Sequence, residues 1–173
     1  MIDELRRHIR DVPDFPTPGV LFRDITPLLR DPAAFSRALD VMAGAVAELR
    51  AEAVVGIESR GFLFGTPIAS RLGLPFVPVR KAGKLPAARM SVEYSLEYGN
   101  SQLDIHADAL PRGQRAVIVD DVLATGGTAR AAAKLVELVG GTVAGVVFLI
   151  EIATLGGREH LHGYEIRSFV QYT

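Results

Sequence analysis

Residues 117–128 read Val-Ile-Val-Asp-Asp-Val-Leu-Ala-Thr-Gly-Gly-Thr, and they predict a strand, a ligand-binding turn and the start of a helix. Residues 117–119 are an unbroken run of β-branched side chains, which is typical of a strand covered on both faces. Asp120 and Asp121 are expected at the carboxyl end of this strand, where parallel sheets bind ligands. Paired carboxylates there suit the vicinal hydroxyls of a ribose, because those hydroxyls can donate hydrogen bonds to them.

The small residues that come next predict a phosphate-binding loop. They are Ala124, Thr125, Gly126, Gly127 and Thr128. Small side chains let backbone N–H groups surround a phosphate, and the helix that follows presents its positive end to the same anion. The alternative is an ordinary strand-to-helix loop with a threonine cap. Two consecutive glycines at a helix start cost stability, which favours the phosphate-binding interpretation.

Outward from this segment, apolar runs and helical periodicities alternate along the chain. Strands are predicted at residues 53–57, 75–79, 143–150 and 166–170, and helices at residues 32–49, 62–72 and 127–139. Strands that alternate with helices indicate an α/β fold whose central, mostly parallel sheet is flanked by helices. Residues 80–93 lack periodicity and predict a mobile loop. Its base is formed by short strands at 94–98 and 102–105, around a turn at 99–101.

The amino-terminal segment differs from the rest in composition. Residues 1–11 predict a short charged helix, and the proline-rich stretch from Pro13 to Pro27 is expected to lack regular structure. Asp31 and Pro32 then start the next helix, with the acid as its cap and the proline at its first position. We expect the irregular segment to wrap over another part of the protein.

Composition limits the classes of function. A chain of 173 residues with 49% hydrophobic side chains suits one domain over residues 1–173. A net charge of −1 gives no general attraction to nucleic acid or to an anionic membrane. The absence of cysteine excludes disulfides and thiolate catalysis, and the four histidines lack metal-ligand spacing. No stretch is apolar enough to span a bilayer, so we expect a cytoplasmic protein.

The twelve-residue segment resembles the phosphoribosyl-pyrophosphate signature of the type I phosphoribosyltransferases. Four further segments resemble the members of that family that act on adenine, in the family's order: residues 15–27, 56–62, 80–86 and 94–99. The resemblance implies the type I fold, with an N-terminal hood from about residues 1–30, a mobile loop over the site, and a homodimer. It implies that adenine N9 attacks C1′ of phosphoribosyl pyrophosphate, giving AMP and diphosphate in purine salvage.

For the phosphoribosyl donor, the resemblance implies two sets of contacts besides the loop at 124–128. Ser59 and Arg60 would bind the pyrophosphate at a turn that carries a cis peptide between Glu58 and Ser59. The cations Arg80, Lys81 and Lys84 would add positive charge. Considered singly, each basic residue is more commonly a solvated surface charge. Asp120 and Asp121 would favour an oxocarbenium-like transition state. Mg²⁺ is expected too, held mainly by substrate oxygens rather than by a side-chain motif.

For the base, the resemblance implies that the backbone of Leu21 and Arg23 reads the edge of adenine and that Phe22 belongs to the same hood. Glu97 would hydrogen-bond or protonate N7, and Tyr98 would help to close the site. Each role has a plainer alternative. Leu21 and Phe22 suit core packing, Arg23 suits a structural ion pair with Asp24, and Glu97 suits an outward position on a strand.

Two rival functions remain at this level. A regulatory protein could use the same fold to sense phosphoribosyl pyrophosphate, but the chain has no room for an added DNA-binding domain. An enzyme acting on guanine, xanthine or hypoxanthine is the nearer rival. A dinucleotide-binding module is disfavoured because no G-x-G-x-x-G follows a strand.

Overall fold

The computed structural model describes residues 2–95 and 99–173. The chain forms two compact units, Met1–Val41 and Met42–Thr173. The helix α3 (Pro32–Glu48) continues from the first unit into the second. Within the described residues, no helix is both long and apolar enough to cross a membrane.

The first unit contains more regular structure than its prolines predict. Its elements are α1 (Ile2–Arg7), β1 (Arg10–Pro13), β2 (Leu21–Asp24), α2 (Thr26–Arg30) and the first part of α3. β1 and β2 pair antiparallel, so the expectation of an irregular segment is wrong. The prolines are tolerated because Pro13 ends its strand and Pro27 lies in the first turn of α2. The predicted cap is confirmed, since the Asp31 carboxylate accepts hydrogen bonds from the N–H groups of Ala33 and Ala34.

The second unit is built on one sheet of seven strands. They are β3 (Ala53–Ile57), β4 (Phe76–Lys81), β5 (Arg89–Ser95), β6 (Asn100–His106), β7 (Arg115–Leu123), β8 (Thr142–Ile152) and β9 (Ile166–Tyr172). Their order is β5-β6-β4-β3-β7-β8-β9, and all neighbours from β4 to β9 run parallel. β6 is antiparallel to both β4 and β5. The predicted mostly parallel α/β sheet is therefore confirmed.

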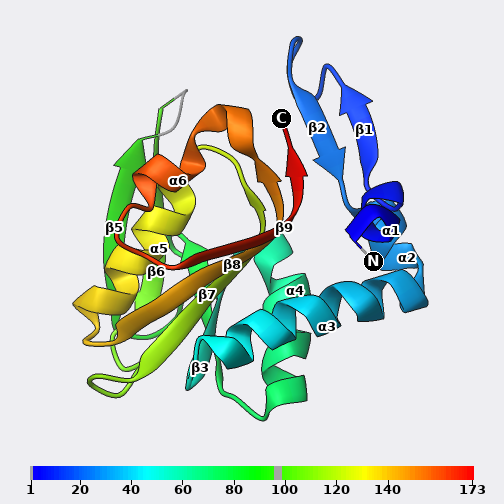
Figure 1. The fold of residues 1–173 in the computed structure, drawn as a ribbon. Coiled ribbons are helices and arrows are strands. Elements are labelled where there is room, and N and C mark those ends of the chain that lie inside the picture. The colour runs from blue at the N-terminus through cyan, green and yellow to red at the C-terminus, as the bar shows by residue number, and fades with distance from the viewer. Residues whose placement is uncertain (1, 96–98) are drawn as a thin grey trace. The chain divides into compact units, whose positions relative to one another are not determined.

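Helices cover both faces of this sheet (Figure 1). α4 (Arg60–Leu72) connects β3 to β4, and α5 (Gly127–Leu138) connects β7 to β8. The two connections move in opposite directions across the sheet, so right-handed crossovers place the two helices on opposite faces. Val55 and Ile118 share one core cluster with Leu135 of α5. A 3₁₀ turn, η1 (Ala153–Leu155), and the short helix α6 (Gly157–His160) lie between β8 and β9.

Several predicted boundaries are wrong. The helix expected at residues 1–11 ends at Arg7, residues 10–13 form β1, and residues 100–101 of the expected turn begin β6. Residues 80–81 and 89–93 belong to strands, which leaves only 82–88 between β4 and β5. β5 was hard to recognise because most of its side chains are exposed, so it lacks the apolar alternation of a half-buried strand. Asp120 and Asp121 lie within β7 rather than after it, since β7 stays paired with β8 as far as Leu123.

The order of the strands predicts where a ligand binds. The chain direction across the sheet reverses between β3 and β7, which are hydrogen-bonded neighbours. In open parallel sheets, the crevice at such a point lies beyond the carboxyl ends of the two strands. Both predicted anion-binding segments, at residues 58–60 and 124–128, follow these two strands.

Candidate active site

A cavity of about 410 Å³ lies at the carboxyl ends of β3 and β7. Its walls come from the turn between β3 and α4, the end of β4, and the loop between β7 and α5. Nine of the predicted donor-binding residues line it: Ser59, Arg60, Lys81, Asp120, Asp121, Ala124, Thr125, Gly126 and Thr128. Segments that are about 60 residues apart in the sequence therefore meet at one site.

The turn after β3 has the backbone that the resemblance implies. The peptide bond between Glu58 and Ser59 is cis. Arg60 follows as the first residue of α4, and its Nε atom lies 2.8 Å from Oδ2 of Asp121. This ion pair joins the turn after β3 to the end of β7. The Asp121 side chain is only 3% exposed, whereas that of Arg60 is 36% exposed.

Glu58 also lines the cavity, and its role was not predicted. One of its carboxylate oxygens accepts a hydrogen bond of 2.9 Å from the backbone N–H of Lys81, and Arg80 donates to both oxygens. Burial alone would raise the pKa of Glu58, but these hydrogen bonds and the charge of Arg80 hold the pKa below its usual range. Glu58 thereby fixes the position of Lys81 at the cavity wall. An acid directly after a buried strand was the available signal.

Arg80 and Lys84, two of the predicted cations, do not line the cavity. Arg80 is paired with Glu58 and also donates to the carbonyl of Lys84. The N–H of Lys84 in turn donates to the carbonyl of Lys81. Arg80, Lys84 and Gly127 are not among the residues lining this cavity. Their predicted contacts with the donor stay predictions.

Asp120 and Asp121 form a strongly interacting pair of carboxyl groups. The backbone N–H of Asp121 donates to Oδ1 of Asp120 over 2.9 Å. Burial, and next the charge of Asp121, raise the pKa of Asp120 well above its usual range. Burial likewise raises the pKa of Asp121, although the neighbouring guanidinium of Arg60 opposes the shift. Ligand groups that donate hydrogen bonds, such as ribose hydroxyls, would compensate these carboxylates for the solvent they lose.

The loop at 124–128 is shaped by close backbone contacts. Gly126 has a left-handed conformation with a φ angle of 85°, and Gly127 begins α5. A Cβ atom at Gly126 would lie 2.5 Å from the carbonyl oxygen of Gly157, so only glycine fits there. Thr128 Oγ1 lies 3.4 Å from the hydroxyl of Tyr94, another lining residue that was not predicted. The remaining lining residues without a predicted role include Ser101, Leu103 and Phe148.

The predicted base-binding residues Leu21, Phe22 and Arg23 all lie on β2, in the first unit. Leu21 is 45% exposed, which argues against the core-packing alternative for this residue. Phe22 packs edge to face on Phe15, with ring centroids 5.1 Å apart.

The alternative of an ion pair between Arg23 and Asp24 is wrong, because each pairs with β1 instead. Arg23 binds Asp11, and Asp24 binds Arg10. The antiparallel register places these partners opposite each other across the two strands. Glu97 and Tyr98 lie outside the described residues.

Fold and site together are those of a phosphoribosyltransferase: the turn after β3, the loop after β7 and a pair of carboxyl groups line one cavity at the point where the sheet reverses direction. The chain belongs to the phosphoribosyl transferase domain family, whose model matches residues 33–170. More particularly, relatives that match it over nearly the full length of both chains include adenine phosphoribosyltransferases. The one from Carboxydothermus hydrogenoformans is 56% identical over 98% of this chain and 99% of its own.

Solved structures lead to the same family. The crystal structure of adenine phosphoribosyltransferase from Thermoanaerobacter pseudethanolicus has a TM-score of 0.97 and 51% identity, over 99% of this chain and all of that one. The Saccharomyces cerevisiae enzyme has a TM-score of 0.92 and 39% identity, over 98% of both chains. It was crystallised with adenine and an imino-altritol bisphosphate.

Proposed function

We propose that this protein transfers the 5-phosphoribosyl group of phosphoribosyl pyrophosphate to N9 of adenine, giving AMP and diphosphate in purine salvage. One observation carries the proposal: the signature residues line a single cavity in a chain that matches adenine phosphoribosyltransferases over nearly its full length. The sequence alternatives, a regulatory protein or an enzyme for another purine, have no comparable support.

The two ends of the donor have separate sets of contacts in this proposal. The 5′-phosphate binds the backbone N–H groups of residues 124–128, with the hydroxyls of Thr125 and Thr128. The pyrophosphate binds the turn at Ser59 and Arg60, with Lys81 close by. This division is supported by the positions of both segments on the wall of one cavity. Positive charge at the pyrophosphate stabilises the leaving group as the bond to C1′ breaks.

Asp120 and Asp121 act between these two segments. Their carboxylates accept hydrogen bonds from the ribose hydroxyls and favour the positive charge that develops on the sugar. The burial of Asp121, which is 2% exposed, strengthens this electrostatic effect, because the surrounding protein screens charge less than water does.

We further propose that Mg²⁺ accompanies the donor and is held mainly by the donor's own oxygens. Within the described residues, no group of three or more His, Asp or Glu side chains is arranged to hold a metal ion. The hard oxygens of Asp120 and Asp121 fit Mg²⁺ when they act together with substrate oxygens. Bound there, Mg²⁺ would offset the charge of the departing diphosphate.

Adenine is selected, in this proposal, by the backbone of Leu21 and Arg23, with Phe22 beside them. A backbone N–H meets N1, and a backbone carbonyl meets the exocyclic amine. Hypoxanthine has a protonated N1 and a carbonyl in place of the exocyclic amine, so both hydrogen bonds would be lost. Unpaired polar groups in a closed site are costly. Glu97 hydrogen-bonds N7, and its carboxylate accepts the proton that adenine loses there as N9 attacks C1′ and diphosphate leaves; Tyr98 helps to exclude water.

The decisive experiment measures pyrophosphate release with phosphoribosyl pyrophosphate, Mg²⁺ and each purine base in turn. We expect release with adenine and formation of AMP. Release with hypoxanthine or guanine but not with adenine would overturn the substrate. Omission of Mg²⁺, with chelator present, is expected to abolish release and tests the metal separately.

Three further parts of the proposal rest on the family resemblance. They are a homodimer, a cytoplasmic location, and the action of residues 1–173 as one domain with a hood from about residues 1–30. Light scattering on the purified protein measures the first, and a monomer at assay concentration would contradict it.

A further inference from the structure

The loop that follows β7 rests against the start of α6. A Cβ atom at Gly157 would lie 2.3 Å from the carbonyl oxygen of Ala124 and 2.7 Å from Cδ1 of Leu123. A Cβ atom at Gly126 would in turn meet the carbonyl oxygen of Gly157. The backbone of α6 and the backbone of the proposed 5′-phosphate loop therefore touch without intervening side chains. Any movement of Gly157 would displace the loop.

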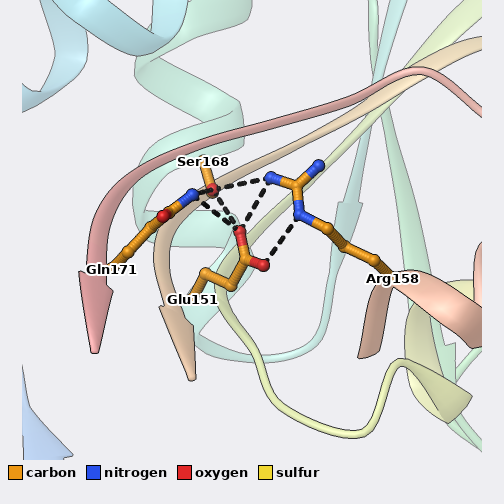
Figure 2. A network of polar contacts seen from close by, with 4 residues as sticks. All are labelled: Glu151, Arg158, Ser168 and Gln171. Atoms are coloured by element: carbon orange, nitrogen blue, oxygen red, sulfur yellow. Dashed lines mark hydrogen bonds and ion pairs between the residues drawn. The ribbon is translucent and has the colours of Figure 1, made fainter. Parts of the chain in front are cut away.

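The residue after Gly157 anchors α6 to the sheet through an almost buried carboxylate (Figure 2). The Nε and Nη2 atoms of Arg158 each donate to a different oxygen of Glu151, both over 2.8 Å. Glu151 is 4% exposed and lies near the end of β8, opposite Leu123 of β7. From β9, Ser168 and Gln171 donate to the same carboxylate. Arg158, Ser168 and Gln171 all donate to Glu151, and Arg158 and Gln171 also donate to the hydroxyl of Ser168.

A second tie fixes the other end of α6. The Arg130 side chain on α5 donates to the carbonyl oxygen of His160 over 2.9 Å, and the backbone N–H of Arg130 donates to the carbonyl of Gly126. Leu161, directly after α6, is fully buried. The short helix is thus held at Arg158 by the sheet and at its last residue by the helix that begins at the loop.

We propose that Glu151 and Arg158 are positioning residues for the 5′-phosphate of the donor, acting through Gly157 on the backbone of residues 124–128. Neither residue lines the cavity, so their effect passes through the backbone contact. This inference rests on the proposed function, because it assumes that the loop binds a phosphate.

The chemistry of the network supports a positioning role. A bidentate pair between an arginine and a carboxylate fixes direction as well as distance. Hydrogen bonds from Arg158, which outweigh burial, hold the pKa of Glu151 below its usual range, so the carboxylate stays charged at neutral pH. The Arg158 side chain is 46% exposed, so this pair holds a half-exposed guanidinium in a fixed direction against an almost buried carboxylate.

The sharpest test compares two adjacent glycines. Gly157→Ala introduces a methyl group into the contact with Ala124. Gly156→Ala adds the same methyl group where the nearest atoms are 3.8 Å away, at a position with a φ angle of 65°. We expect Gly157→Ala to weaken ribose 5-phosphate binding about tenfold or more, since small misplacements of a binding group have large effects. Pyrophosphate binding should be unchanged. The control Gly156→Ala should lower thermal stability and leave both affinities intact.

The ionic network is tested in the same way with Arg158→Gln and Glu151→Gln. Both are expected to raise the KM for phosphoribosyl pyrophosphate and weaken ribose 5-phosphate binding, with the KM for adenine and the affinity for pyrophosphate unchanged. The matched control is Arg167→Gln, which removes an ion pair between Arg167 and Glu165. Both of these side chains are exposed. Calorimetric titration with ribose 5-phosphate and with pyrophosphate measures the two affinities.

Two outcomes separate the inference from the function on which it rests. If the unmodified enzyme makes AMP but the three variants bind ribose 5-phosphate normally, the positioning role is wrong and the function stands. Equal losses of ribose 5-phosphate and pyrophosphate binding would also overturn it, because they would indicate a general effect on folding. If the unmodified protein releases no pyrophosphate with adenine, the proposed function itself fails.

Discussion

The turn after β3 and the loop after β7 line the same cavity, and the proposed function assigns an anion to each, but the two are built differently. The turn after β3 presents charged side chains, chiefly Arg60, and Glu58 holds the neighbouring Lys81 in place. The loop after β7 consists of small residues whose backbone N–H groups are the available donors. A pyrophosphate that must leave suits side-chain cations that can follow it. A 5′-phosphate that stays bound throughout suits rigid backbone groups.

The acids of the two regions differ as well. Hydrogen bonds and a nearby guanidinium lower the pKa of Glu58, whereas burial and mutual repulsion raise the pKa of Asp120. The carboxylate after β3 therefore already has its partners within the protein. For the carboxyl groups of β7, burial outweighs the partners within the protein, which include Arg60 and a backbone N–H, and ribose hydroxyls would supply further donors.

The largest change is expected from Arg60→Ala, which removes the main cation from the turn after β3. We expect kcat/KM for phosphoribosyl pyrophosphate to fall about 10³-fold, as when one charge-stabilising donor is lost from a catalytic site. Inhibition by pyrophosphate should weaken, while inhibition by ribose 5-phosphate is retained. Arg60→Lys, which keeps a positive charge, should recover part of the loss. Steady-state kinetics with both inhibitors measures the difference, and equal weakening would break the comparison.

Glu97→Gln should affect neither anion-binding region. We expect turnover to fall about 10²-fold, within the range of acid-base effects, with little change in the affinity for ribose 5-phosphate or pyrophosphate. The matched control is Glu93→Gln, an exposed position on β5. Single-turnover kinetics would separate the chemical step from product release. Unchanged turnover would remove Glu97 from the mechanism.

Thr128→Val tests how far the loop after β7 depends on its side chains. The change keeps the shape of the residue and removes one hydroxyl, so we expect about tenfold weaker binding of ribose 5-phosphate, a loss typical of one hydrogen bond to a charged group. Pyrophosphate binding should stay the same. Thr142→Val, at the exposed start of β8, is the control. A loss as large as that of Arg60→Ala would show that this loop also depends mainly on side chains.

The smallest effect is expected from Asp120→Asn. It is a gain in thermal stability, whereas the variants above lose activity or affinity. Because the folded-state pKa of Asp120 is raised, its contribution to stability is present below the unfolded pKa and is lost as pH rises through the folded value. Asp120→Asn should therefore raise the Tm of the ligand-free protein at pH 7 by about 3 °C, the shift that about 1 kcal/mol produces in a domain of this size. At a pH below the unfolded pKa the gain should vanish.

Calorimetry at both pH values measures this difference, with Asp108→Asn, an exposed position, as control. Activity should fall in Asp120→Asn although the protein is more stable. A lower Tm at pH 7 would show that the carboxylate is already satisfied in the free protein.

Sequence predicted the parts of the molecule whose pattern is local and strong. The β-branched run of β7 and the small residues after it were recognisable because burial on both faces and close backbone approach restrict residue types. The order of β3, α4 and β4 followed from alternating apolar runs. The cis peptide at Glu58 and Ser59 came from the family resemblance and is present.

What sequence missed depends on contacts between distant segments. β5 is mostly exposed, so no apolar alternation marked it. Glu58 looked like any acid after a strand, because its partners Arg80 and Lys81 are more than 20 residues away. α6 is only four residues long and has no periodicity to detect. The pairing of Glu151 with Arg158 was equally invisible, since a charged residue within an apolar strand gives no indication of its partner.

The pairing of β3 with β7 has one more consequence. Their parallel backbone hydrogen bonds hold the two strands about 4.8 Å apart, the ordinary spacing within a sheet. The separation of the two segments that follow these strands is therefore set by the main chain rather than by the side chains around them. Substitutions elsewhere, including those in residues 21–23, could change which base is accepted without altering the donor site. The same sheet can therefore serve enzymes that accept different bases and transfer the same phosphoribosyl group.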